Sequence, residues 1–428
     1  MGTTYATHCV DNGTYEFLFA PVPAEQRKPS NQLISILLGF SFAISGIAVG
    51  VQLGRSLPLA HALAVSLAGN LFLFLIALFW GILGYRSGCT ISCLIKSLLG
   101  GKIAYIFSFF LVFAVVVWVS INGEWCANSV ITYFPNWPLP RAVTIPYMLL
   151  LIILPSLKGW KALTWISRIC VPLIVVLTVW HIIWMGTISQ GFTIQQPVSA
   201  AGLTVSDAFT FVVGDFMLSS VFIPDVCRFS KNKQTVWGCT VVYALTLIIS
   251  NIVGILLAMA SGAHNLIYGT YLLHLLLPSF CWLFLCVFTT QGLNIYAGSL
   301  AMQSLLNGTR LGGNVSCRVT VLLLGCLSML ISSIGITRYL SSFVRILTIA
   351  VITLTEIAMI EVVLKKKRKP VNQDLPFFCW LLSIAVGGVI LVFAKWHSWL
   401  MILTVSGIAY TLFRGKSHPG EPNGPSVL

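Results

Sequence analysis

The chain has 428 residues, of which 57% are apolar and only 8% are charged. Soluble domains carry about 25% charged residues, so this composition excludes a water-soluble globular protein and indicates a polytopic membrane protein. The formal net charge of +14 does not call for a nucleic-acid partner, because basic residues beside membrane spans account for it. We therefore expect the lipid bilayer, and no nucleic acid, as the macromolecular environment.

Apolar segments of about 20 residues, the length needed to cross a bilayer, recur along the chain. We predict an all-α fold with twelve transmembrane helices, which leaves little chain for a soluble domain. The predicted spans, in chain order, are 33–53, 60–84, 103–131, 142–157, 165–187, 205–225, 237–259, 276–302, 317–336, 340–364, 376–394 and 397–413.

Basic residues predict the orientation of these spans. With the N-terminus inside, 20 of the 25 Lys and Arg residues fall on the cytoplasmic side, including the run Lys365 to Lys369. The five others lie on or near the outer side: Arg55, Arg141, Arg338, Arg345 and Lys395. The positive-inside rule therefore places both termini in the cytoplasm, and we expect a plasma-membrane protein, in a bacterium the inner membrane.

The order of the spans suggests two inverted halves. The predicted divisions are a cytoplasmic N-terminal segment, a first five-helix repeat, a second inverted repeat, two additional helices and a cytoplasmic tail, at 1–32, 33–187, 205–364, 376–413 and 414–428. The first span of each repeat, LGFSFAISG at Leu38 and VVGDFMLSS at Val212, places glycine before an aromatic residue and serine soon after. This pattern predicts broken helices 1 and 6, although glycine and serine are also common in packed membrane helices.

Asp215, in the sixth predicted span, is an acid among apolar residues. A carboxylate near the bilayer centre costs roughly 2.5 to 3.5 kcal/mol, so it persists where a partner or a water-filled cavity receives it. The eighth span adds a polar stretch, TTQGLNIYAGS, from Thr289 to Ser299. Broken helices beside such polar groups are typical of transporter binding sites.

Several segments, in order, resemble the nucleobase:cation symporter-1 family, most closely its cytosine permease branch. The segments are PVPAEQRKP (21–29), LGFSF (38–42), Gly69-Asn70, LGYRSG (83–88), VVGDF (212–216), PDVCRFSKN (224–232) and TTQGLNIYA (289–297). The resemblance covers about residues 21 to 413, and its most specific element is Asp225, Arg228 and Phe229. It implies the five-plus-five inverted-repeat fold of the leucine-transporter type, alternating access, and uptake of a heterocyclic base driven by a cation gradient.

The same resemblance implies a substrate site. Trp118 matches the family's stacking tryptophan, and Phe216 would cover the other face of a planar base. By position, Asp215 replaces a small polar residue of the cytosine permeases and Gln291 replaces an asparagine, while Asn294 adds a second amide one turn later. Trp118 could instead be a packing residue, and the two amides could join helices.

A sodium site is also implied by the family pattern. Backbone carbonyls of a broken helix and hydroxyls of a neighbouring helix supply the oxygens that Na+ needs. The pattern places them on the carbonyls of Gly39, Phe42 and Cys286 and on the side chains of Thr289 and Thr290. Proton coupling stays open, and apart from the coupling ion we expect no cofactor.

Three departures from the family concern buried positions. Glu124 lies past Trp118 in the third span, Glu356 lies in the tenth, and Ile352 and Thr353 replace a proline pair. Buried acids could hold a protonated or donor-rich substrate, for which Glu124 joins the candidate site, or one of them could carry a proton. Glu356 could instead pair with Arg345 or with a neighbouring helix.

Together these observations predict a monomeric symporter that imports a nucleobase or related heterocycle, a cytosine-like pyrimidine or a purine, with Na+ or H+. A pyrimidine vitamin precursor such as hydroxymethylpyrimidine is an alternative substrate. An intramembrane enzyme is a weaker alternative, because the sequence shows no nucleophile with a base partner and no metal-binding cluster in its loops. A channel would not need a dedicated stacking tryptophan.

Overall fold

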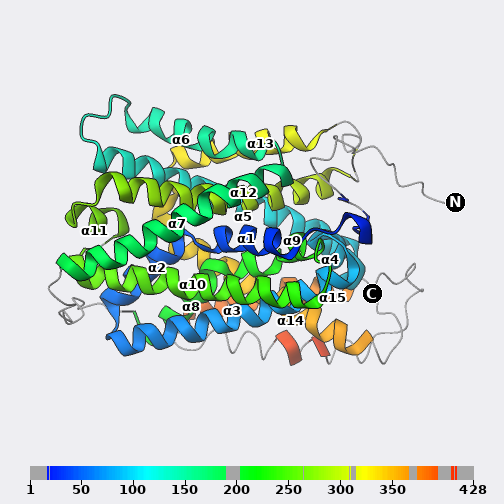
Figure 1. The fold of residues 1–428 in the computed structure, drawn as a ribbon. Coiled ribbons are helices and arrows are strands. Elements are labelled where there is room, and N and C mark those ends of the chain that lie inside the picture. The colour runs from blue at the N-terminus through cyan, green and yellow to red at the C-terminus, as the bar shows by residue number, and fades with distance from the viewer. Residues whose placement is uncertain are drawn as a thin grey trace.

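The computed structural model describes residues 17, 18, 20–188, 203–263, 265–307, 309, 315–365, 374–393, 406–408, 410 and 411. Long helices run side by side in a bundle, with α11 near one end and α4 near the other (Figure 1). The elements are η1 Ala24–Gln26, α1 Ser30–Ser41, α2 Ile44–Ser56, α3 Leu59–Ser87, α4 Ile91–Leu99, α5 Gly101–Tyr133, α6 Arg141–Ser156, α7 Trp160–Ile188, α8 Val205–Val221, α9 Pro224–Cys227, α10 Lys233–Ser261, α11 Leu266–Leu272, α12 Leu276–Leu306, α13 Cys317–Ser333, η2 Ile336–Tyr339, α14 Leu340–Lys365 and α15 Asp374–Phe393.

Seven of the described helices are long and apolar enough to cross a membrane, or eight if α1 and α2 form one bent span. Three shorter apolar helices, Arg141–Ser156, Cys317–Ser333 and Asp374–Val389, coincide with other predicted spans. The prediction of a helical membrane protein is therefore confirmed. Most of the twelfth predicted span, 397–413, lies outside the described residues, so the number twelve and the inverted repeat stay predictions.

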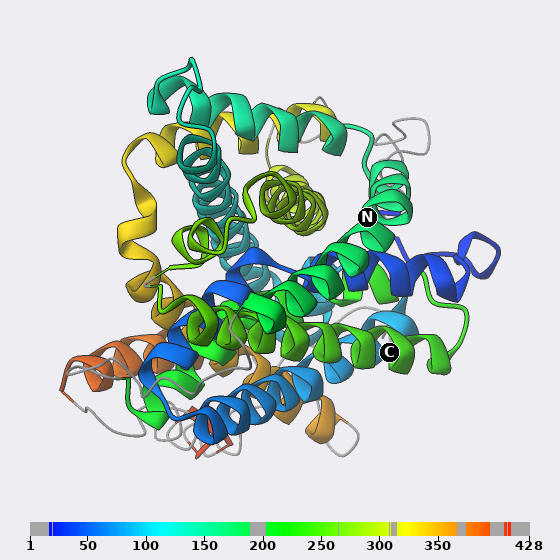
Figure 2. The same ribbon diagram turned by 60° about the vertical axis from the view of Figure 1, so that its left-hand side comes forward.

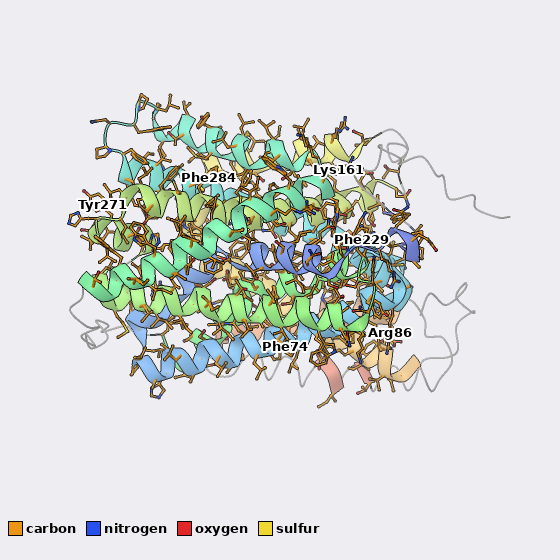
Figure 3. All side chains as sticks on the ribbon, viewed as in Figure 1. Phe74, Arg86, Lys161, Phe229, Tyr271 and Phe284 are labelled. Atoms are coloured by element: carbon orange, nitrogen blue, oxygen red, sulfur yellow. The ribbon has the colours of Figure 1, made fainter. Side chains whose placement is uncertain are left out.

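The two ends of the bundle differ in the residues they carry. Figure 3 labels Tyr271 at one end and Arg86 and Phe229 toward the other. We call these the α11 end and the α4 end. Lys96 on α4 and Lys102 at the start of α5 also belong to the α4 end.

A break separates α1 from α2, which meet at an angle of 46°. Phe42 (φ −79°, ψ 74°) and Ala43 between them are not helical. The Ala43 N–H, which a continuous helix would donate to the Gly39 carbonyl, donates instead to the Ser41 carbonyl at 3.0 Å. Backbone oxygens at the end of α1 are therefore released from the helical pattern inside the bundle.

The break predicted within Val212 to Ser220 is wrong in position, because α8 is continuous from Val205 to Val221. The Ser220 hydroxyl donates a 3.1 Å bond to the Phe216 carbonyl of its own helix, so it does not open the backbone. The interruption comes at Phe222 and Ile223, and α9 restarts with Pro224 at its first position, where the missing proline N–H is tolerated.

Close helix contacts organise the interior. α2 packs against α10, α3 against α8, and α14 against α8. A Cβ on Gly50 would overlap the backbone of Asn251, so glycine is what allows the α2 and α10 backbones to touch. In Figure 2, α12 is seen nearly along its axis, enclosed by α5, α6, α7 and α13, which all contact it. The polar stretch of α12 is consequently inside the protein.

Candidate functional site

A cavity of about 430 Å³ lies toward the α11 end of the bundle. Its walls come from α2, α5, α8, α11 and α14, so the second half of the broken α1–α2 pair forms one side. The lining includes two predicted site residues, Trp118 and Asp215. It also includes Ser45, Trp125 and Tyr268, which the sequence analysis did not single out.

Asp215 lies on the continuous helix α8 with its side chain 7% exposed. Ser45, just after the break, lines the same cavity and is the polar side chain beside this carboxylate. A Cβ on Gly46 would lie 3.9 Å from Asp215 Oδ2, so the start of α2 passes close to the acid. The acid therefore reaches the cavity beside the break through its side chain.

A buried polar network holds the start of α2 in this position. Asn251 on α10 donates a 2.8 Å bond to the Gly46 carbonyl and accepts bonds from Asn70 Nδ2 at 2.7 Å and from Ser66 Oγ at 3.1 Å. These residues are all buried. Because every bond in the network joins groups that water does not reach, it fixes α2 against α3 and α10.

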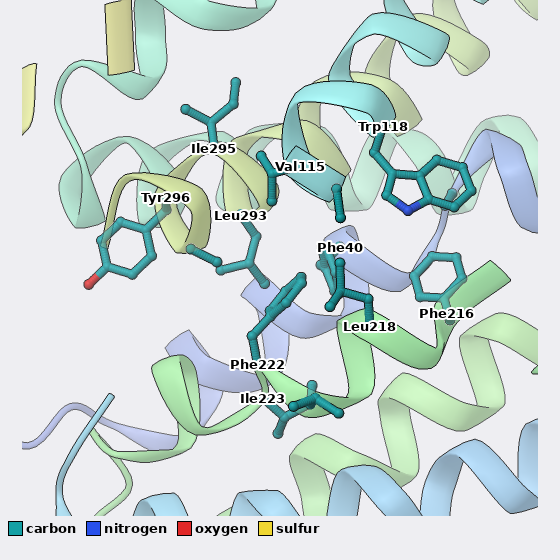
Figure 4. Packing of buried hydrophobic residues seen from close by; sticks show 14 of the residues in the cluster. Phe40, Val115, Trp118, Phe216, Leu218, Phe222, Ile223, Leu293, Ile295 and Tyr296 are labelled. Carbon is teal, nitrogen blue, oxygen red and sulfur yellow. The ribbon is translucent and has the colours of Figure 1, made fainter. Parts of the chain in front are cut away.

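Trp118 on α5 and Phe216 on α8 approach the same region of the core, and Figure 4 shows their side chains reaching toward one another. Trp118 meets Phe343 edge to face, with ring centroids 5.7 Å apart. Phe216 meets Phe40 in the same manner, at 5.8 Å. Phe216 is not among the residues that line the cavity, and only 3% of it is exposed.

Gln291 and Asn294, the two predicted amides on α12, are buried and bonded to each other. Asn294 Nδ2 donates to Gln291 Oε1 at 3.1 Å, and the Gln291 Nε2 donor is buried without a partner among the described residues. Neither residue lines the cavity. A donor left free in a buried site is a group that a ligand could satisfy.

Three of the five residues predicted for sodium, Gly39, Thr289 and Thr290, lie close together at the end of α1. The Thr290 hydroxyl donates a 3.0 Å bond to the Phe40 carbonyl, and a Cβ on Gly39 would lie 3.3 Å from Thr289 Cβ. The Thr289 hydroxyl donates to the Cys286 carbonyl at 3.1 Å. The structure thus brings Gly39, Thr289 and Thr290 together, with Phe42 two residues from Phe40 and Cys286 one helical turn before Thr289 and Thr290.

Glu124 lies apart from the cavity lining, although sequence analysis placed it with the substrate. Its carboxylate is fully buried and accepts bonds from the Ile336 N–H at 2.8 Å and from the Thr337 hydroxyl at 2.7 Å. Arg141 adds an ion pair at 3.4 Å. Glu124 consequently fastens η2 and the start of α14 to α5, and its oxygens are occupied by the protein.

Glu356 forms a hydrogen bond to a neighbouring segment, which was one of the two alternatives to a role with substrate or proton. It accepts a short hydrogen bond from the hydroxyl of Ser406, in the twelfth predicted span. α14 continues through Ile352 and Thr353, where the Thr353 hydroxyl donates to the Ile349 carbonyl at 2.8 Å. Glu356 therefore joins α14 to the described turn that contains Ser406.

The α4 end is closed around the Asp225, Arg228 and Phe229 motif. Arg228 is fully buried and donates to the carbonyl of Phe17 at 2.5 Å and to the Tyr296 hydroxyl at 3.2 Å. Its guanidinium lies 4.6 Å from the centre of the Phe229 ring. Asp225 Oδ1 accepts the Ile91 N–H at 3.0 Å. One motif thus joins α9, α12, α4 and the N-terminal segment.

The N-terminal segment crosses this end directly. Arg27 donates to the Ser230 carbonyl at 2.9 Å and to the Tyr85 carbonyl at 3.3 Å, and the Lys28 N–H donates to the Phe229 carbonyl at 2.9 Å. In the described part of the chain, the N-terminal segment therefore packs across the α4 end, whereas the cavity lies toward the α11 end.

Two of the cavity-lining residues that were not predicted could have been inferred from their positions in the sequence. Trp125 is seven positions after Trp118, two helical turns along the same face of α5. Ser45 lies inside the predicted break segment, Leu38 to Gly46. Tyr268 comes from α11, a short helix between two spans, and its place beside the cavity depends on tertiary packing alone.

Comparison with known proteins identifies the family. Residues 21–375 match the family described as permeases for cytosine/purines, uracil, thiamine and allantoin. Cytosine permeases from Escherichia coli K12 and O157:H7 are each 28% identical over 298 residues, which cover 68% of this chain and 69% of each relative.

Solved structures share the fold at low identity. Mhp1, a nucleobase-cation-symport-1 family transporter, closed with bromovinylhydantoin bound, gives a TM-score of 0.71 at 14% identity over 94% of both chains. Inward-facing Mhp1 gives 0.72 at 15% identity over 92% of this chain and 91% of that one. An outward-open Na+-coupled sialic acid symporter gives 0.69 at 12% identity, covering 97% and 94%. The chain therefore belongs to the nucleobase:cation symporter-1 family, and it is a membrane transporter rather than an enzyme.

Proposed function

We propose that this transporter imports a nucleobase or a closely related planar heterocycle by symport with Na+ or H+. The observation that carries the proposal is the cavity beside the α1–α2 break, lined by Trp118 and Asp215. An aromatic face binds a planar base by stacking, and polar groups at the edge select among bases. The proposed site also includes Phe216 as a second aromatic group. Its amides are Gln291 and Asn294, which a conformational change brings to the substrate.

The positive-inside rule makes the α4 end cytoplasmic and the α11 end external, with both termini in the cytoplasm of a plasma-membrane protein. In this orientation the cavity faces outward while Arg228 and the N-terminal segment close the inner side. Alternating access then requires the inner contacts to separate after the outer cavity has closed. A monomer is sufficient for this cycle, and the five-plus-five inverted repeat gives it two symmetry-related states.

For the coupling ion we propose a Na+ site formed by the carbonyls of Gly39, Phe42 and Cys286 and the hydroxyls of Thr289 and Thr290. The donor set fits a hard cation, because all five groups are neutral oxygens. The oxygens released at the break lie beside the two threonines. Coupling to a proton would make this donor set unnecessary for uptake.

The test is uptake of radiolabelled bases into proteoliposomes that contain the purified protein, with an inward Na+ gradient, an inward proton gradient, or neither. Cytosine, adenine, guanine, uracil and hydroxymethylpyrimidine form the panel. Accumulation that depends on one gradient supports symport and identifies the ion. Gradient-independent equilibration would indicate a channel or facilitator, and no uptake of any heterocycle would refute the proposed substrate class.

A further inference from the structure

The residues that line the described cavity carry a single formal charge. Among the described lining residues, Asp215 is the only acid and there is no lysine or arginine. Among the described residues, the ion pairs involve Lys102 with Asp374 and Arg141 with Glu124, and none involves Asp215. The cavity therefore presents a carboxylate to its contents with no cation of the protein's own beside it.

The carboxylate still has acceptor positions to fill. An ionised carboxylate has about four lone-pair positions on two oxygens, and Ser45 is the polar side chain beside it in the cavity wall. A single hydroxyl can fill one of these positions, so others stay open to a ligand. Two parallel N–H donors can therefore bind the acid side by side, and such charge-assisted pairs are stronger than bonds between neutral groups. A ligand edge that presents carbonyl oxygens would instead be repelled.

The walls of the cavity favour the same ligand. Trp118, Trp125 and Tyr268 line it, and Phe211 adds a fourth ring. Flat aromatic faces bind planar heterocycles and attract those that carry positive charge. The aromatic walls and the acid together select a flat, electron-poor or cationic ring with donors on one edge.

Building on the proposed function, we propose that the substrate is a planar heterocycle with two adjacent N–H donors on one edge, which Asp215 accepts as a pair. Two kinds of base provide this edge. A neutral amino-lactam such as guanine has a ring N–H beside an exocyclic amino group. An aminopyrimidine such as cytosine gains the same arrangement when its ring nitrogen is protonated.

Binding of matched bases to purified full-length protein in nanodiscs tests the proposal. Hypoxanthine is guanine without the exocyclic amino group, so it loses one of the two donors. We expect guanine to bind about tenfold or more tightly than hypoxanthine, the usual difference for one bidentate contact. Cytosine should bind more tightly at mildly acidic than at neutral pH, while uracil should bind weakly at both. Preference for guanine alone identifies the amino-lactam, and acid-dependent cytosine binding identifies the cationic base.

Asp215→Asn supplies the decisive change, because the amide keeps one acceptor but replaces the other with a donor. The ratio of guanine to hypoxanthine affinity should fall to about one, while neutral cytosine, with an amino donor beside a ring acceptor, should bind better than in the wild type. Asp215→Glu keeps the charge and should keep the preference at reduced affinity. Ser45→Ala, which removes the hydroxyl beside the acid, should also keep the guanine preference. Melting temperatures of all variants control for folding.

Three outcomes would overturn the inference. A wild type that binds bases with no preference for a donor pair leaves the proposed function in place and removes only this role of Asp215. An Asp215→Asn protein that keeps the guanine preference but loses concentrative uptake makes the acid a proton carrier. Failure of the wild type to bind any of the four bases removes the proposed function along with the inference.

Discussion

The hydroxyl of Thr290 donates a 3.0 Å hydrogen bond to the carbonyl of Phe40, across 250 positions of sequence. Phe40 lies in the last turn of α1, where the backbone leaves its helical pattern, and Thr290 lies in the middle of α12. One side chain thus touches the released backbone at the point where we propose that the coupling ion binds.

Removing this hydroxyl should impair ion coupling. Thr290→Val keeps the shape of the side chain but loses the oxygen proposed as a Na+ ligand. Losing even an outer-shell partner of a metal ligand costs about tenfold or more in affinity, so we expect the Na+ concentration for half-maximal uptake to rise at least on the order of tenfold. Thr290→Ser keeps the oxygen and is the matched control. Sodium titration of uptake in proteoliposomes measures both. A valine variant with the sodium dependence of the wild type would remove Thr290 from the ion site.

Trp118 should be required for binding. Trp118→Ala removes a stacking face worth roughly 1 to 3 kcal/mol per base, so affinity should fall by about tenfold or more. Trp118→Phe keeps a smaller aromatic face and should retain part of the base affinity. Trp165 on α7 is a fair control, because 65% of its side chain is exposed on the outside of the bundle. Base binding and melting temperature are measured together, and normal binding by a well-folded Trp118→Ala protein would refute the stacking role.

The sequence was sufficient for the class of fold and for part of the site. Composition and span length predict the membrane helices, and the position of Asp215 in an apolar run predicts that something receives it. The location of the second break was wrong, because Gly214 packs against Val344 and Thr348 of α14 and does not open the helix. Glycine serves both purposes in membrane helices, and only tertiary contacts distinguish them.

Glu124 illustrates a second limit of sequence reasoning. An acid in a predicted span signals that a partner exists, but its partners here are the Ile336 N–H and Thr337 hydroxyl, more than 200 positions away. No local sequence pattern predicts a contact between residues so far apart in the chain. Conversely, Trp125 lies on the same helical face as Trp118, so its place in the cavity could have been predicted from periodicity.

Glu124→Gln should therefore affect stability more than recognition. The amide would point a donor at one of the groups that now donate to the acid, leaving buried polar groups unpaired at a cost of roughly 1 to 3 kcal/mol. We expect a lower melting temperature with base affinity changed much less than in Asp215→Asn. Thr337→Val, which removes one donor, should show a smaller decrease. Wild-type stability combined with lost binding would return Glu124 to the substrate site.

The closed α4 end should depend on Arg228. Its guanidinium bonds to Phe17 and Tyr296 in different directions and stacks on Phe229. Lysine keeps the charge but has neither the planar fork nor the stacking surface. Arg228→Lys should consequently favour states in which this end is open, and uptake should fall because the closed state that accepts external substrate is less populated.

Cys227, fully buried one position before Arg228, reports on this opening. We expect a small maleimide to modify Cys227 faster in Arg228→Lys than in the wild type, with the modified cysteine identified by mass spectrometry. Tyr296→Phe, which removes one bond to the guanidinium and keeps the ring, should give an intermediate rate. Cys126, buried on α5 near Glu124, is the internal control, because general unfolding would expose both thiols. Protection of Cys227 in Arg228→Lys equal to that in the wild type would mean that Arg228 does not hold the α4 end closed.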